Sequence, residues 1–145
     1  MRRIAVFSSS VFVLLLLVFA ASTAQAQITD QIEANVHHSF ILGNTTLPPG
    51  RYIFRMLSDS NLEFMRATSA DGRTSTEFLV RESEDSHTPR HSELIFNRYG
   101  SKEFLARIYQ VGTKDGVAVA DVSREEGRLQ KKGQKAAEHT EEQVK

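Results

Sequence analysis

Hydrophobic and polar residues alternate along this chain in short runs that are separated by turn-forming residues. Alternation places successive side chains on opposite faces of a β-strand, and short strands spaced about ten residues apart are typical of antiparallel all-β domains. Six runs follow this pattern and a seventh is possible: residues 31–42, 51–57, 62–68, 73–81, 93–99, 102–111 and 117–122. We therefore predict an all-β domain over residues 27–122, with six to seven antiparallel strands that form a small barrel or sandwich.

One face of each predicted strand is apolar. In the first run the even-numbered positions from 32 to 42 are apolar except at His38, and in the sixth run Phe104, Ala106 and Ile108 share a face. Several of the intervening positions, whose side chains point to the opposite face, are also apolar. A sheet with one face exposed to solvent carries polar residues at those positions. The apolar ones are Ile53, Leu57, Leu105, Tyr109 and Val111. They lie at the rims of a closed barrel or sandwich, or they form an exposed apolar patch that binds a partner.

The C-terminal part of the chain changes character. Ser123 and Glu126 form a capping box, in which Ser123 caps the first amides of a helix and Glu126 reaches back to it. Gly133 is well placed to end that helix, so we predict a short capped helix over residues 123–133. Residues 134–145 show no apolar period, and we expect a polar, disordered tail.

The N-terminal segment has the pattern of an export signal. Arg2 and Arg3 are followed by an almost purely aliphatic stretch at residues 11–21, and Ala24-Gln25-Ala26 has small residues at the two positions that signal peptidase reads. We expect residues 1–26 to be a cleaved signal peptide and the protein to be periplasmic or extracellular, with no stable membrane insertion after cleavage. The alternative is an uncleaved anchor, because the apolar stretch is borderline for spanning a bilayer.

Composition and charge exclude several classes of function. The 145-residue chain has no Cys, which rules out disulfides, thiolate metal sites and cysteine nucleophiles. Its formal net charge is zero, or −2 once Arg2 and Arg3 leave with residues 1–26. General nucleic-acid binders are clearly basic, so we expect no nucleic-acid partner.

The best candidates for metal ligands are His87, His91 and Glu93, because two imidazoles and a nearby carboxylate can bind zinc in principle. Pro89 and the polar sequence of residues 82–92 argue against the helix that would bring both imidazoles to one point. We interpret these residues as parts of a solvated loop and expect no metal site.

The other histidines are interpreted as surface residues. His37 and His38 lie in the first predicted strand, so their side chains point to opposite faces and cannot chelate together. His139 lies in the predicted tail. The chain also lacks a G-x-S-x-G elbow and a glycine-rich phosphate loop, and its paired carboxylates have polar surroundings. We therefore expect no catalytic residue, no cofactor and no enzymatic activity.

Several stretches together carry a resemblance. The segments FILGN (40–44), LPPGRY (47–52) and LIFNRYG (94–100), with Phe104-Leu105 after them, resemble the F-x-x-G…LPxG-x-Y and F-x-R-Y-G…FL motifs of a group of small exported bacterial all-β proteins of unknown function. The resemblance covers residues 28–130 and implies the β fold, but no activity or site residue. The chain departs from the pattern at Pro49, where a small residue is usual, and at Glu103, where an aromatic residue is common.

Three functions remain open. The leading hypothesis is a non-catalytic binding or envelope-associated module with an unknown envelope protein as its partner. A second is a β-barrel carrier of a small apolar ligand, which needs a pocket lined by aromatic residues such as Phe54, Phe64, Phe78, Phe96 and Phe104. A third is a small metal-dependent hydrolase, which needs His87, His91 and Glu93 to converge on one metal position, with His37 or His38 in addition.

Overall fold

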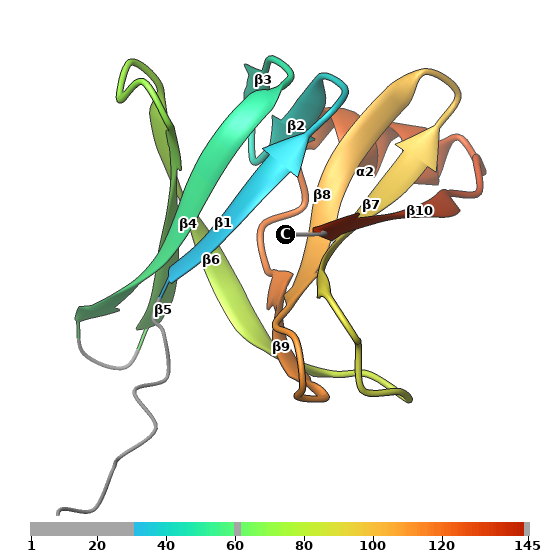
Figure 1. Ribbon diagram of the computed structural model, residues 1–145. Coiled ribbons are helices and arrows are strands. Elements are labelled where there is room, and N and C mark those ends of the chain that lie inside the picture. Colours follow the sequence, from blue (N-terminus) through green and yellow to red (C-terminus); the bar gives the residue numbers. More distant parts are fainter. Residues whose placement is uncertain (1–30, 60–61, 144–145) are drawn as a thin grey trace, which may run out of the picture.

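A computed structural model describes residues 31–59 and 62–143, which form ten strands and one short helix (Figure 1). The elements are β1 (Gln31–Val36), β2 (Phe40–Leu42), β3 (Thr45–Leu47), β4 (Gly50–Asp59), β5 (Leu62–Ser69), β6 (Ser75–Glu84), β7 (Ser92–Tyr99), β8 (Lys102–Tyr109), β9 (Asp115–Val119), α2 (Arg124–Lys131) and β10 (Ala137–Gln143). An all-β fold with a short C-terminal helix is thus confirmed. The predicted signal peptide, residues 1–26, lies outside the described residues.

The described strands outnumber the six to seven that hydrophobic alternation predicts. The first predicted strand divides into β1 and β2, because residues 37–39 leave the strand conformation. The short strand β3 and the polar strand β10 add two more, and neither is marked by apolar alternation. Among the described residues, no helix has the length and apolar character that crossing a membrane requires.

The strands form one open sheet in two parts that are joined by β6. Antiparallel pairing runs β1–β4–β5–β6, and the second half of β6 pairs with β9, which leads through β8 to β7 and β10. The β2–β3 hairpin joins in parallel to β8, with Ile41 opposite Phe104. Among the described strands no ladder pairs β1 with β10, so the sheet is open and does not form the barrel, one of the two predicted architectures. Figure 1 shows the β1–β4–β5 part on the left and the β7–β8–β10 part on the right.

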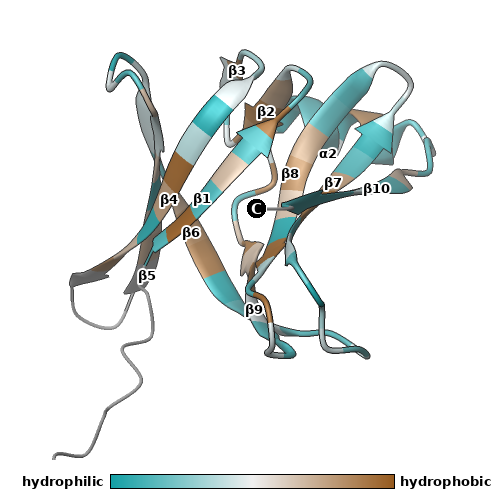
Figure 2. Ribbon diagram, viewed as in Figure 1, coloured by the Kyte–Doolittle hydropathy of each residue, from teal (hydrophilic) through white to brown (hydrophobic). Residues whose placement is uncertain are grey.

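The hydrophobic core contains the apolar face that alternation predicts. Phe40, Tyr52, Phe54 and Phe96 are all buried to 1% exposure or less. The ring of Phe40 meets Tyr52 and Phe96 edge to face, at centroid distances of 5.3 and 5.8 Å. Such contacts add to the free energy that area burial alone provides. Figure 2 shows the matching apolar bands on β4, β6 and β8.

A β-bulge in β8 changes which of its side chains face the core. The register with β7 shifts at Ala106, which lies between the pairs Ile95–Arg107 and Phe96–Leu105. One extra residue in a strand moves the following side chains to the other face. As a result Leu105 and Ile108 both belong to the main core, whereas Phe104 is buried outside it. The prediction that Phe104 and Ile108 share a face was therefore wrong.

The helix α2 is attached to β7. Ser123 Oγ accepts a 3.0 Å hydrogen bond from the amide of Glu126, as the capping box predicts. The carboxylate of Glu126 does not reach back; it accepts a 2.8 Å hydrogen bond from Asn97 of β7 instead. Gly133, with φ at +76°, follows the helix in the left-handed conformation that favours glycine.

The strand β10 pairs with β7 over all seven of its residues, from Ala137 to Gln143. The prediction of a disordered tail over residues 134–145 was therefore wrong for residues 137–143. Strand pairing satisfies backbone amides and carbonyls whatever the side chains are, so it needs no apolar pattern. Figure 2 shows β10 as one of the most hydrophilic elements of the fold.

Candidate functional site

An apolar cleft lies between the two parts of the sheet. Its volume is about 370 Å³ and it is partly open to solvent. It is lined by Ile32 of β1, Phe54 and Met56 of β4, Met65 of β5, Ile108 of β8, Gln110, Thr113, and Asp115, Gly116 and Val117 of β9. A cleft of this volume is within the range of small-molecule binding sites.

The floor of the cleft is apolar and its mouth is polar. Phe54, Met65 and Ile108 are buried core residues. At the mouth, the Thr113 hydroxyl donates a 3.3 Å hydrogen bond to the carboxylate of Asp115. Among the described lining residues, Asp115 is the one ionisable side chain. The arrangement favours binding of an apolar molecule and offers no pair of groups for acid–base chemistry.

Gly116 shapes one wall of the cleft. A Cβ atom at this position would lie 2.3 Å from Cδ1 of Tyr109 and 2.5 Å from the carbonyl oxygen of Ile108. Real Cβ atoms do not approach so closely, so the backbone of β9 and the Tyr109 ring can pack together only because residue 116 is glycine. The hydroxyl of Tyr109 lies 2.9 Å from Oγ of Ser83, which holds the ring in place.

The aromatic residues that the carrier hypothesis expects in a pocket mostly lie elsewhere. Phe54 lines the cleft. Phe78 and Phe96 are buried in the core, Phe104 is buried apart from it, and Phe64 is half-buried. Methionine and aliphatic side chains provide most of the remaining apolar lining, and unbranched methionine adapts to ligands of varied shape.

The predicted metal-ligand candidates do not form one group. His87 Nδ1 lies 3.0 Å from the carboxylate of Asp85, and its Nε2 lies 3.8 Å from that of Glu93. His91 joins no cluster with them. Among the described residues, one group of three potential metal ligands has ligand atoms close together, and it consists of His38, Glu103 and His139.

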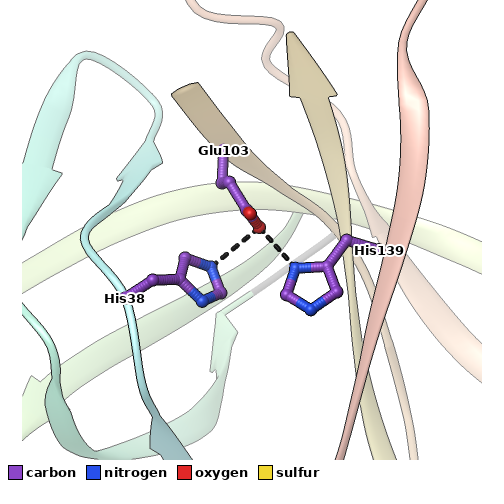
Figure 3. Close-up of side chains that lie close together, drawn as sticks. All are labelled: His38, Glu103 and His139. Carbon is purple, nitrogen blue, oxygen red and sulfur yellow. Dashed lines mark hydrogen bonds and ion pairs between the residues drawn. The ribbon is translucent and has the colours of Figure 1, made fainter. Parts of the chain in front are cut away.

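This His–Glu–His cluster gathers residues from three separate elements (Figure 3). His38 lies in the link between β1 and β2, Glu103 lies in β8, and His139 lies in β10. Strand register explains why His139 lies near Glu103. On β7, Phe96 pairs with His139 on one side and with Leu105 on the other, and Leu105 is two residues from Glu103. Residues two apart on a strand share a face.

Short contacts link the members of the cluster. Nδ1 of His139 lies 2.6 Å from Oε2 of Glu103, and Nε2 of His38 lies 2.9 Å from the same oxygen. The other carboxylate oxygen of Glu103 accepts a 2.6 Å hydrogen bond from Nε of Arg98. Glu103 is 8% exposed. Burial by itself would raise the pKa of Glu103, but the hydrogen bonds from His139 and Arg98 and the nearby imidazoles lower that pKa overall.

Alternate residues of β10 all reach toward the β1 edge. Nδ1 of His38 lies 3.1 Å from Oε1 of Glu141, and the side chain of Gln143 accepts a hydrogen bond from the amide of Asn35. His139, Glu141 and Gln143 are half-buried, while the residues between them are exposed. His37 is placed differently, because its side chain is 73% exposed.

Hydrophobic patterning could not find this cluster. The sequence assigns His38 to a continuous strand and His139 to a tail, and the structure contradicts both assignments.

Comparison with protein-family models, curated proteins and solved structures gives no significant match for this chain.

Proposed function

We propose that this chain is a binding module for a small apolar molecule, which it holds in the cleft between β4, β5 and β9. The observation that carries the proposal is a cleft of about 370 Å³ whose floor consists of the buried side chains of Phe54, Met65 and Ile108. Apolar ligand surface removed from water there contributes about 25 cal/mol per Å² to binding. The ligand is a compact hydrocarbon-rich molecule, and a small polar end would face Thr113 and Asp115 at the mouth.

We also propose that the protein is exported and acts in the periplasm or outside the cell. The support is the charged start, aliphatic stretch and small-residue cleavage pattern of residues 1–26. A partly open cleft admits an apolar molecule without separation of the strands.

Native mass spectrometry of the purified chain, repeated after denaturation, tests for a retained ligand. We expect a mass excess equal to one small organic molecule that disappears on denaturation. Calorimetric titration with a medium-chain fatty alcohol, whose hydroxyl can face Thr113 and Asp115, provides a second test, in which we expect saturable binding of one molecule per chain.

A matched pair of variants locates the site. Thr113→Trp at the cleft mouth should weaken fatty-alcohol binding by roughly tenfold or more, since it fills the entrance. Thr46→Trp in β3 is the control, because Thr46 is exposed and does not line the cleft. Equal binding by both variants, or no saturable binding by the unmodified chain, would overturn the proposal.

A further inference from the structure

We infer that His38, Glu103 and His139 bind a divalent transition-metal ion at a site separate from the apolar cleft. The three ligand atoms, two imidazole nitrogens and one carboxylate oxygen, all lie within 4.8 Å of one another. None of the three residues lines the cleft. This set of donors matches three-ligand zinc sites, in which the fourth position is taken by water or a substrate.

The distances fit an ion once side-chain rotations open the two contacts to Glu103 and bring the two imidazole nitrogens, which lie within 4.8 Å of each other, toward ligand spacing. Around a tetrahedral zinc ion with bonds of about 2.0–2.1 Å, neighbouring ligand atoms lie about 3.4 Å apart. Here Oε2 of Glu103 is 2.6 Å from Nδ1 of His139 and 2.9 Å from Nε2 of His38. Side-chain movements of less than about 1 Å open these contacts to ligand spacing. The His38 and His139 side chains are 23% and 28% exposed, which leaves access for the ion and for a water ligand.

Glu141 orients His38 toward the ion. In the tautomer that binds a metal through Nε2, Nδ1 of His38 carries the proton and donates the 3.1 Å hydrogen bond to Oε1 of Glu141. That Nε2 atom is buried and lies 2.9 Å from Oε2 of Glu103. Two lone pairs this close need a positive charge between them, supplied by a metal ion or by a proton on the imidazole. A carboxylate on the far nitrogen of a metal-binding imidazole is the common supporting arrangement in metal sites.

The local charge balance also favours a cation. The carboxylates of Glu103 and Glu141 both face His38, and Oε2 of Glu141 is buried without a hydrogen-bond partner. Arg98 supplies one positive charge, to the other oxygen of Glu103. A buried carboxylate is stable when it is paired or coordinates a metal. Two imidazoles with one carboxylate select Zn²⁺, Ni²⁺ or Cu²⁺ over Mg²⁺ and Ca²⁺, which prefer oxygen ligands alone.

The competing interpretation is a metal-free network in which a protonated imidazole provides the positive charge beside Glu103. The two interpretations differ in metal uptake. Calorimetric titration of the metal-free chain with zinc chloride should show one Zn²⁺ per chain with a micromolar or tighter Kd, and Co²⁺ should give the visible absorption of a tetrahedral site. Absence of saturable Zn²⁺ binding would overturn the inference and establish the metal-free network.

Variants assign the site to this cluster. His139→Ala should weaken Zn²⁺ binding by at least tenfold, and Glu141→Gln should weaken it by about tenfold without changing the stoichiometry. His87→Ala is the matched control, because His87 lies in another loop beside Asp85. Loss of binding in His87→Ala but not in His139→Ala would overturn the assignment.

A measurement on the unmodified chain removes any dependence on variant folding. The imidazole NMR signals of His38 and His139 should shift on Zn²⁺ addition, whereas those of His87 and His91 should not. Shifts confined to His87 and His91 would contradict the inference. Fatty-alcohol binding in the cleft should be unchanged by Zn²⁺, so failure of either proposal leaves the other intact.

Discussion

The backbone amide of Asn35 donates a 2.7 Å hydrogen bond to the side-chain oxygen of Gln143, a residue 108 positions further along the chain. Glu141 acts in the same way, since its carboxylate accepts a 3.4 Å hydrogen bond from the amide of His37. β1 pairs with β4 along its length, and its remaining edge faces β10. Side chains of β10 therefore bridge the gap between β10 and the free edge of β1. We call these contacts, Asn35–Gln143 and His37–Glu141, the seam.

Replacement of Gln143 by Ala should destabilise this seam. The change leaves the amide of Asn35 without its partner, and loss of one such hydrogen bond costs about 1 kcal/mol in the free energy of unfolding. Urea unfolding of the two proteins measures the difference. Glu142→Ala is the control, because Glu142 is exposed on the opposite face of β10. An equal effect of both substitutions would show that Gln143 contributes no specific bond.

Gly116→Ala and Gly127→Ala should have opposite effects on stability. The first substitution places a Cβ against Tyr109 and the Ile108 carbonyl, and such overpacking costs about 1–3 kcal/mol. The second adds a Cβ in α2 with no atom within 4 Å, and alanine is favoured over glycine in a helix by about 0.5–1 kcal/mol. Thermal unfolding should therefore give a lower Tm for Gly116→Ala and a higher Tm for Gly127→Ala. A Gly116→Ala protein as stable as the parent would contradict the close packing of β8 and β9.

Tyr52→Phe should change the response of stability to alkaline pH. Burial, with a smaller contribution from the charge of Asp71, raises the pKa of Tyr52 above its ordinary value of 10.0. The folded chain thus keeps the phenol proton to higher pH than the unfolded chain, so the stability from this group is complete below pH 10.0 and is lost as pH rises through the folded pKa.

At neutral pH the Tyr52→Phe variant should be less stable by about 1 kcal/mol, because it loses the 2.7 Å hydrogen bond to the carbonyl oxygen of Pro48. Above pH 10.0 the advantage of the parent should shrink. Urea unfolding at a series of pH values measures both differences. A gap between the two proteins that stays constant with pH would be inconsistent with a raised pKa at Tyr52.

Ser123→Ala should destabilise the protein through α2. The hydroxyl of Ser123 accepts the Glu126 amide hydrogen bond at the start of the helix, and removal of such a cap costs about 1 kcal/mol. Ser101→Ala in the exposed β7–β8 turn is a comparison with no cap to lose. Circular dichroism during thermal unfolding reports both variants, and identical midpoints would refute the role of the cap.

Predictions from the sequence were correct where interactions between residues close in the chain determine the structure. The apolar positions Ala34, Val36, Phe40 and Leu42 are all buried as alternation predicts, and Ser123 caps its helix. The prediction from alternation was wrong beyond Ala106, because this unpaired residue reverses which of the side chains of β8 face the core. A bulge depends on how two strands fit together, so the hydropathy of one strand does not reveal it.

The candidate sites were less predictable for a related reason. His38, Glu103 and His139 come together through three pairings: β2 with β8, β8 with β7, and β7 with β10. The last of these relies on backbone hydrogen bonds beneath polar side chains, which carry no hydrophobic signal. Sequence proximity instead directed attention to His87 and His91, which lie close in the chain and do not form a group in the structure.

The seam between β1 and β10 also has a kinetic consequence. Its contacts join residues more than a hundred positions apart, such as Asn35 and Gln143, and contacts of that separation carry a large loop-closure entropy. We therefore expect hairpins such as β4–β5 and β7–β8 to form first and the seam to close late in folding. Because hydrogen bonds to side chains hold the seam and no strand ladder does, we expect it to open before the rest of the sheet, and amide hydrogen exchange at Asn35 and His37 should be faster than at the β4–β5 ladder.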